Sequence, residues 1–384
     1  MRPDRDESMT DAADTIRVCF IAPKAYPIFN PAVEKVFGGA EVDLYLLATE
    51  LAKDPAYQVS FIVADYGQPD GEIRQGVRLL KTLTFRENMP AGAKKVWQGM
   101  RRADADIYMH EAASMGTVLA AAFCRRYRRA FVYRTASSRE ADGAFFAANR
   151  IQGFFVRRAF RAADVVIVQN DRDADNLRRT AGVAPIVIRN ACRLPAAWQT
   201  SKDSILWAGR SLPVKRPDLF LDLAEAFPQQ RFVMICQEGT GDADYQRLVR
   251  QARAIENLTF IPRVPYHEID MYYQNAAIFV NTSESEGFPN AFIQAAAAGA
   301  AILSYRVNPD DFLTRYRCGL SCSGDFDTLK QQLASLLDHD RYRQLGQNAR
   351  HYAEQHHDIN RIVERYKTLF GEAARPRKGK GIEP

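Results

Sequence analysis

One stretch of the sequence, residues 276–303, constrains the fold more than any other. It begins with five apolar residues, 276–280, which predict a strand, and a polar loop follows them. Strong helix formers at 291–298 then predict a helix that ends at Gly299, and apolar residues at 301–303 predict a second strand. Units that run strand, loop, helix, strand build parallel sheets, so the chain is predicted to be an α/β protein.

The loop between this strand and this helix suits the recognition of an anion and a sugar. Ligands of parallel sheets bind at the carboxyl ends of strands, where the N–H groups of a helix start favour phosphate. Gly287 would let a ligand approach the backbone, and Glu286 would accept hydrogen bonds from hydroxyl groups. Gln294 follows on the helix at a spacing that could reach from a sugar to a ribose across a diphosphate. An ordinary buried βαβ unit with a polar loop is the alternative interpretation.

The chain of 384 residues is long enough for two domains, and strands alternate with helices in two successive series. The first series predicts a doubly wound domain over residues 15–190, and after a linker at 191–202 the second fills residues 203–371. Residues 1–14 lack the apolar core of a signal peptide and predict a disordered leader, and residues 372–384 predict a disordered basic tail. The sequence has no apolar run of about twenty residues, so no transmembrane helix is predicted.

The cysteines predict buried free thiols and a reducing cytoplasm. Several of the six fall within apolar, strand-like segments, and their spacing does not suggest a disulfide framework. Cys318 and Cys322 have no second pair of ligands nearby, so a zinc site is not expected.

Two further loops carry candidate anion-binding residues. Arg210 and Lys215 directly follow a predicted strand and precede a helix, which is a phosphate site by position. Two solvated surface cations are the alternative. Gly38 and Gly39 open a helix at the first strand-to-helix turn, where they could admit a phosphate or a sugar or serve only as a hinge. They do not match the G-x-G-x-x-G fingerprint, so nicotinamide binding is not indicated.

Taken together, the chain resembles a family 4 glycosyltransferase of GT-B fold. The segments that carry the resemblance are LWAGRSLPVKRPDLFLDLA from Leu206, NLTFIPRVPYHEIDMYYQNAAIFVNTSESEGFPNAFIQAAAAG from Asn257, ADVVIVQNDRDADNLRR with VIRNAC within residues 163–192, and FGGAE at residues 37–41. The resemblance covers about residues 16–370. It implies two Rossmann-like doubly wound domains that face each other across a cleft. It also implies a retaining, metal-independent transferase that needs no cofactor and takes a hexose-type sugar from a nucleotide-diphosphate donor.

The resemblance assigns roles by position in this sequence. Arg210 and Lys215 would hold the diphosphate and stabilise the leaving group, and Glu286 would bind hydroxyls of the donor sugar. The backbone at Arg263 and Val264 would meet the base. The last helix would cross back onto the first domain. The other donor-binding positions are Gly38, Gly39, Gly287, Phe288, Pro289, Asn290 and Gln294, and those from Gly287 to Asn290 would present backbone N–H groups.

Two departures from the family pattern leave other functions open. Gln294 stands where a glutamate usually takes the ribose hydroxyls, and Ser137 or a neighbour stands where a histidine often touches the reacting sugar. His110 is the only histidine of that half, and it is either a cleft residue or a structural one. A GT-B protein that binds a nucleotide sugar without transferring it, and a GT-B nucleotide-sugar epimerase, are therefore the alternatives.

Asp-x-Asp triplets could indicate a metal-dependent GT-A enzyme instead. They occur at Asp104/Asp106, Asp171/Asp173, Asp173/Asp175 and Asp242/Asp244. We expect them at helix ends and turns, and the second series of strands and helices argues against a single GT-A domain. No metal site is therefore predicted.

Positive charge is concentrated in the first half of a chain whose 52 basic and 46 acidic residues leave a net charge of +6. Arg157, Arg158 and Arg161 share a predicted helix with Phe154, Phe155 and Phe160. A basic helix with aromatic residues can lie on anionic lipid, although a solvated basic face is the alternative. Nucleic acid is not expected, because no recognition motif accompanies the charge. The predicted partners are a nucleotide-diphosphate sugar and a glycan or lipid-linked acceptor, in surface polysaccharide or glycolipid assembly at the inner face of the membrane.

Overall fold

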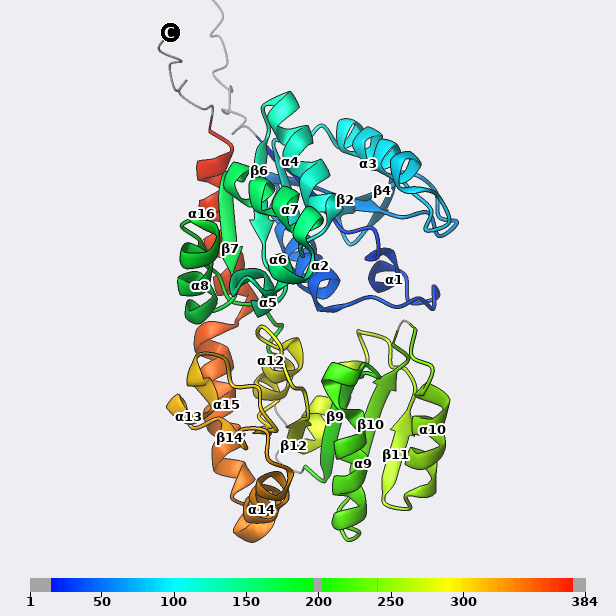
Figure 1. The fold of residues 1–384 in the computed structure, drawn as a ribbon, viewed down its shortest axis with the longest axis vertical. Helices are drawn as coiled ribbons and strands as arrows, with labels where there is room; N and C mark the ends of the chain where they lie inside the picture. Colours follow the sequence, from blue (N-terminus) through cyan, green and yellow to red (C-terminus); the bar gives the residue numbers. More distant parts are fainter. Residues whose placement is uncertain (1–14, 197–201, 240, 376–384) are drawn as a thin grey trace, which may run out of the picture.

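A computed structural model describes residues 15–196, 202–239 and 241–375 of the chain. Two α/β domains lie one above the other, each with its own sheet covered by helices on both faces (Figure 1). The predicted leader at 1–14 and most of the predicted tail lie outside the described residues. So do residues 197–201 of the predicted linker.

The first sheet has eight strands in the order β3-β4-β2-β1-β5-β6-β7-β8, and among these only β3 and β4 pair antiparallel. Its strands are β1 (Ile16–Ile21), β2 (Tyr57–Val63), β3 (Glu72–Arg74), β4 (Val77–Lys81), β5 (Ile107–Glu111), β6 (Ala130–Arg134), β7 (Val165–Val168) and β8 (Ile186–Val187). Helices α1 (Tyr26–Phe29), α2 (Gly39–Leu51) and α16 (Ile359–Ala373) cover one face. The other face carries α3 (Met89–Ala103), α4 (Met115–Tyr127), α5 (Ser138–Ala141), α6 (Ala144–Ala148), α7 (Arg150–Ala162) and α8 (Asp171–Ala181).

The second sheet has six parallel strands in the order β11-β10-β9-β12-β13-β14. Its strands are β9 (Ser204–Arg210), β10 (Phe232–Gln237), β11 (Leu258–Ile261), β12 (Ala276–Asn281), β13 (Ala301–Ser304) and β14 (Gly319–Ser321). Helices α9 (Pro217–Ala226), α10 (Tyr245–Ala254) and α14 (Phe326–Leu337) pack on one face. The other face carries α11 (Ile269–Asn275), α12 (Asn290–Ala297), α13 (Phe312–Arg315) and α15 (Tyr342–His356).

The apolar runs of the sequence become strands because both faces of each sheet are buried by helices. All five residues of β5, all five of β6 and all six of β12 are buried. Two of these strands end on a charged residue, Glu111 in β5 and Arg134 in β6, and both charges are buried as well. The six cysteines are buried and free, as predicted.

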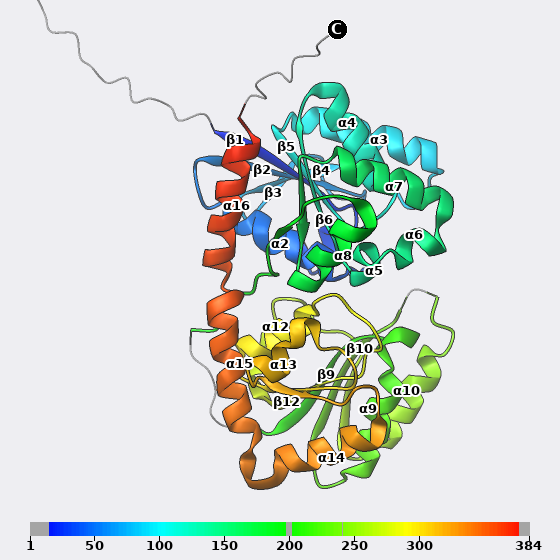
Figure 2. The same ribbon diagram turned by 60° about the vertical axis from the view of Figure 1, so that its left-hand side comes forward.

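The carboxyl-terminal helices join the two domains. Figure 2 shows α15 against the second domain and α16 against the first, one continuing the other along the same side of the molecule. The helical path breaks at His357, whose Nδ1 lies 2.7 Å from the carbonyl oxygen of Asn190. There the linker pairs with the crossover, since Cys192 N–H donates to the His357 carbonyl at 2.8 Å and Ile359 N–H to the Cys192 carbonyl at 3.0 Å. Burial lowers the pKa of His357 to about 3, so this hinge histidine is neutral.

Some elements differ from their prediction. The predicted helix that carries Arg157, Arg158 and Arg161 is separated at Asn149 from a short helix before it, as α7 and α6, and the last helix is separated from α15 at His357. The short β3 was not expected, because its three residues lack a recognisable apolar alternation. Phe160 on α7 is fully buried and does not share the exposed face of Phe154 and Phe155.

Candidate donor site at the carboxyl ends of the strands

Lys215 and Glu286 meet at the carboxyl ends of two neighbouring strands. Lys215 follows β9 and Glu286 follows β12, and these strands pair in the second sheet. The Lys215 Nζ lies 2.6 Å from Glu286 Oε2. The two loops are tied together by backbone contacts, because the Thr282 hydroxyl donates to the Lys215 carbonyl at 2.6 Å and Glu284 N–H to the Val214 carbonyl at 2.9 Å.

The Glu286 carboxylate is held in its ionised form. Its side chain is only 14% exposed. Burial acts to raise its pKa, but the charge and hydrogen bond of Lys215, together with the hydrogen bonds of Ser283 and Asn281, hold the pKa below its usual value. Ser283 and Asn281 add hydrogen bonds to Oε1 at 2.6 and 3.1 Å. The carboxylate is therefore fixed in place and remains an acceptor at neutral pH.

Arg210 is the last residue of β9, and Lys215 lies in the loop that follows this strand. Its guanidinium makes no ion pair with any residue that the structure describes, whereas the neighbouring Arg216 is bound to Asp218 and Glu284. Arg210 is therefore the cation of this loop that is available to an anion.

The glycine loop of the first domain reaches the same place. Gly38 N–H donates to Glu41 Oε2 at 2.8 Å, which caps the start of α2. The Gly39 carbonyl accepts from the Asn290 side-chain amide at 3.2 Å, so the loop touches the first residue of α12 in the other domain. A side chain at Gly39 would crowd this contact, since its Cβ would lie 3.3 Å from the Asn290 amide nitrogen.

A buried polar network that was not predicted lies behind this contact. Arg134 donates to Glu111 at 2.6 Å, to Asp43 at 3.0 Å and to Asn190 at 2.7 Å. Asn190 donates to Asn290 Oδ1 at 2.5 Å, and Asn290 donates to Asp43 Oδ1 at 2.9 Å. The network therefore links the two domains. The only signal in the sequence was a charged residue at the end of two otherwise apolar strands.

The first domain also contacts the EGFPN loop, residues 286–290, through the turn that follows β6. The backbone at Ser137 and Ser138 lies against Gly287, whose Cβ, if it had one, would come within 3.4 Å of the Ser137 Cα. The Ser138 hydroxyl lies 3.4 Å from the Glu286 carbonyl oxygen. Ser137, the residue that stands in the place of the family histidine, is thus brought to the loop that carries Glu286.

The backbone N–H groups expected for the ligand need a correction. Pro289 has no N–H, and the N–H of Phe288 donates to Gln169 Oε1 of the first domain at 3.3 Å. The Phe288 ring is buried against Phe312. Among the described residues, nothing accepts the N–H groups of Gly287 and Asn290, so these two remain for a ligand.

His110 does not lie open in the cleft. It is 6% exposed, and its Nδ1 is 3.3 Å from the Thr117 hydroxyl at the start of α4. Burial lowers its pKa to about 4, so it is neutral at physiological pH. The structure favours the structural alternative for this histidine.

Gln294 and the Arg263–Val264 loop have their contacts away from Glu286. Gln294 lines a hollow of about 180 Å³ that it shares with Tyr266, Asp270 and Tyr45 of the first domain. Arg263 reaches across to Glu34 of the first domain at 3.4 Å, and Val264 packs against the core of the second. The structure does not bring these residues into contact with Lys215 or Glu286.

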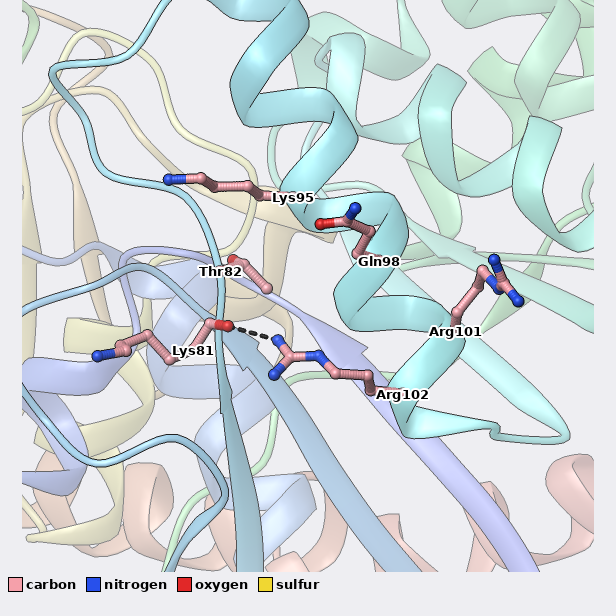
Figure 3. A pocket seen from close by; sticks show the side chains of 6 residues that line it. All are labelled: Lys81, Thr82, Lys95, Gln98, Arg101 and Arg102. Carbon is pink, nitrogen blue, oxygen red and sulfur yellow. Dashed lines mark hydrogen bonds between the residues drawn. The ribbon is translucent and has the colours of Figure 1, made fainter.

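A hollow of about 620 Å³ lies elsewhere, between β4 and α3 (Figure 3). Four cations line it, but three are bound to carboxylates: Lys95 to Glu87, Arg102 to Asp70 and Lys81 to Asp65. The Arg102 guanidinium also reaches the Lys81 carbonyl oxygen, and Arg101 turns away from the other cations (Figure 3). The charge of this hollow is compensated, so we do not place the donor there.

The Asp-x-Asp triplets have structural partners. Asp104 and Asp106 both pair with Arg17 and Arg129. Within residues 15–196, 202–239 and 241–375, no three His, Cys, Asp or Glu side chains are grouped to hold a metal ion. In the same part of the chain, every helix is too short or too polar to cross a bilayer. That no metal is required stays a prediction.

Comparison with known families matches both halves of the chain. Residues 37–193 match the model described as Glycosyltransferase Family 4, and residues 193–352 match the model described as Glycosyl transferases group 1. A Haemophilus influenzae protein described as an uncharacterized glycosyltransferase is 24% identical over 155 residues. This match spans 38% of the present chain and 42% of the length of that relative.

Solved structures share the whole fold. Sucrose-phosphate synthase from Thermosynechococcus elongatus is 17% identical with a TM-score of 0.76, over 93% of this chain and 98% of that one. WaaG, a glycosyltransferase involved in lipopolysaccharide biosynthesis, is 14% identical with a TM-score of 0.66, over 92% and 99%. A trehalose-6-phosphate protein from E. coli bound with UDP-2-fluoro glucose is 10% identical with a TM-score of 0.67, over 92% and 98%. These likenesses confirm the GT-B fold and exclude the GT-A alternative.

Proposed function

This chain belongs to the group 1 glycosyltransferases, and from that premise we propose that it transfers a hexose-type sugar from a nucleotide-diphosphate donor, with retention, to a glycan or lipid-linked acceptor. One observation carries the proposal. Arg210, Lys215 and Glu286 come from the loops after two adjacent strands, and the Gly39 loop of the facing domain closes over the same place. Two cations and an ionised carboxylate suit a diphosphate and a sugar respectively. A related fold with bound UDP-2-fluoro glucose supports this choice of donor class.

In this mechanism the side chains of the second domain bind and stabilise the donor. Arg210 offers two parallel N–H groups to phosphate oxygens, and Lys215 adds a point charge as negative charge builds on the leaving diphosphate. Glu286 accepts hydrogen bonds from sugar hydroxyls and orients the anomeric carbon. When the donor binds, Lys215 would be shared between Glu286 and phosphate. No protein nucleophile is required for attack on the same face that the leaving group departs from.

A thermal-shift screen tests the donor assignment. UDP-, GDP-, ADP- and dTDP-linked hexoses are compared with their bare nucleotide diphosphates, and donor hydrolysis is followed in those that stabilise. We expect one nucleotide sugar to raise the Tm by several degrees, because a ligand that binds only the folded state stabilises it. In Glu286→Gln the extra stabilisation by the sugar should be lost, while that by the bare nucleotide remains.

Glu284→Gln is the matched control, because Glu284 lies on the same loop but pairs with Arg216 and Arg306. It should keep the sugar-dependent shift. If no nucleotide stabilised the protein, the donor assignment would be wrong. Stabilisation without hydrolysis or transfer to any acceptor would instead support an inactive nucleotide-sugar-binding protein.

We also place the enzyme at the cytoplasmic face of an anionic membrane, held by helix α7. Phe154 is 65% exposed on this helix, and Ile151 and Phe155 are exposed beside it. Arg125, Arg157, Arg158 and Arg161 surround Phe154 around a hollow of about 290 Å³. Apolar rings that enter the lipid boundary and arginines that meet anionic headgroups are the two parts of an interfacial anchor.

Vesicle sedimentation tests this anchor. The protein should bind vesicles that contain phosphatidylglycerol and not pure phosphatidylcholine, and added salt should weaken binding because headgroup attraction is screened. The double variant Phe154→Ser/Phe155→Ser should lower the bound fraction at least about tenfold, since each buried ring contributes apolar area. Ile73→Ser, an exposed apolar residue on β3, is the control. Equal binding by both variants would exclude α7 as the anchor.

A further inference from the structure

Three aromatic rings form a row along the edge of the first domain. Tyr26 follows β1, Tyr66 follows β2 and Phe85 follows β4, and these strands are successive neighbours in the sheet. The Tyr26 and Tyr66 rings are stacked with centroids 5.7 Å apart, and Phe85 meets Tyr66 edge-on at 6.0 Å. Because the row follows the carboxyl ends of the strands, it lies on the side that faces the second domain, where Figure 1 shows α1.

We infer that Phe85 and Tyr66 form a platform on which a pyranose ring of the acceptor stacks. The inference rests on the proposed transferase function and names the part of the acceptor that is recognised. The apolar C–H face of a pyranose complements the negative face of an aromatic ring, while its hydroxyls need polar partners at the ring edge. Both requirements are met at this row.

Burial along the row is graded, which leaves one ring face free. Tyr26 is buried and donates from its hydroxyl to Glu72 at 3.0 Å, so it anchors the row. Tyr66 is half-buried between its two neighbours. Phe85 is 56% exposed although Tyr66 holds its edge. Met89, also exposed, begins α3 four residues later and extends the apolar surface of this loop.

Polar groups flank the rings. No residue that the structure describes forms a hydrogen bond with the Tyr66 phenol. Burial, aided by the charge of Glu41, raises the pKa of Tyr66 to about 12, so its O–H stays a donor. The adjacent Asp65 carboxylate accepts from Gly67 N–H at 2.9 Å and lies 3.6 Å from Lys81 Nζ. Its side chain is partly exposed, so an acceptor oxygen is open to a sugar hydroxyl.

The row lies on the same side of the first domain as the glycine loop, because α1, which carries Tyr26, packs against α2 through the rings of Phe29 and Tyr45. Glu41, whose charge acts on Tyr66, is the residue that caps the Gly38 N–H at the glycine loop. An acceptor sugar on Phe85 and Tyr66 would therefore approach the glycine loop from the first domain. The donor would be held by Lys215 and Glu286 from the second domain. An acyl or prenyl chain fits this surface less well, because it would desolvate the Tyr66 phenol without giving it a hydrogen-bond partner.

The test uses three variants of Phe85 with one control. Phe85→Ala removes the ring, Phe85→Leu keeps apolar volume without an aromatic face, and Phe85→Trp keeps the face. Tyr127→Ala, an exposed ring on α4, is the control. Each full-length protein is applied to an array of oligosaccharides that end in a hexose or N-acetylhexosamine. The thermal shift with the nucleotide sugar is recorded in parallel.

We expect Phe85→Ala and Phe85→Leu to weaken binding of the best oligosaccharide about tenfold, and Phe85→Trp and the control to retain it. The nucleotide-sugar shift should be the same in all five proteins, because the platform belongs to the other domain. Full binding by Phe85→Leu, or no oligosaccharide bound by the wild type, would overturn the platform. If Phe85→Ala still bound the oligosaccharide but no longer bound a lipid chain, the platform would also be overturned.

The two proposals fail in different ways. If the nucleotide-sugar shift is absent from the wild type while oligosaccharide binding depends on Phe85, the donor assignment fails and the platform stands. If the shift is present and Glu286-dependent while oligosaccharides bind equally to all Phe85 variants, the platform fails and the transferase stands.

Discussion

Replacing Arg210 with alanine is expected to lower kcat for sugar transfer by roughly 10²- to 10³-fold, the usual loss when one preorganised group that stabilises transition-state charge is removed. Arg210 stands at the carboxyl end of β9, and its guanidinium has no ion-pair partner in the part of the chain that the structure describes. Its removal therefore leaves no buried charge behind. The Tm without ligand should stay close to that of the wild type. Steady-state kinetics with the nucleotide sugar found by the screen measure the effect.

Arg231 supplies the control for this prediction. It precedes β10 at the opposite, amino end of the same sheet and pairs with Asp203 at 2.6 Å on the surface. Arg231→Ala should leave kcat unchanged. A wild-type kcat in Arg210→Ala would contradict the role of Arg210 at the diphosphate. A large loss of Tm in that variant would mean that Arg210 supports the fold rather than the ligand.

Replacing Arg134 with methionine is expected to lower the free energy of unfolding by about 3–5 kcal/mol, because removing one partner of a buried ion pair leaves uncompensated charge. Arg134 is 2% exposed and faces the carboxylates of Asp43 and Glu111. Burial raises the pKa of both carboxyl groups, whereas the charge and hydrogen bond of Arg134 act to lower it, so removing the arginine takes away what favours their ionised form. Urea unfolding followed by circular dichroism measures the loss.

A rescue variant separates charge from packing. Combining Arg134→Met with Glu111→Gln and Asp43→Asn removes both uncompensated carboxylates, so it should recover part of the lost free energy. The exposed pair Arg231–Asp203 is the reference, since Arg231→Ala should cost under about 1 kcal/mol. A loss under about 1 kcal/mol in Arg134→Met, or no recovery in the triple variant, would show that the network does not support the fold.

Asn290 explains why loss of the Arg134 network should also affect the donor loop. Its side chain joins the Arg134 network through Asn190 and Asp43, while its backbone begins the helix that follows Glu286. This connection was not predicted, because nothing local in the EGFPN letters indicates a partner some 250 positions earlier. The sequence assigned Asn290 to the ligand through its backbone, and the structure adds a second role for its side chain.

Much of the donor site was predictable from the sequence because it depends on local order. Apolar runs that end in polar loops indicated where strands stop, and parallel sheets bring those ends together. Lys215 and Glu286 therefore meet once β9 and β12 pair, and Arg210 ends the same strand β9, while its role at the diphosphate stays a prediction. The Phe288 N–H was predicted to face the ligand, but it donates to Gln169. This acceptor belongs to the other domain, so the local sequence does not indicate it.

The sequence by itself determined the alternation of strands and helices, the two-domain order and the loops that carry the candidate donor residues, since these follow from periodicity and helix signals read within a few residues. Only the tertiary structure decided that His110 is buried, that the Arg134 network reaches Asn290 of the second domain, and that Tyr66 and Phe85 form one row. Those features depend on which strands become neighbours and how closely the domains meet. They are set by contacts between distant residues, which no local pattern encodes.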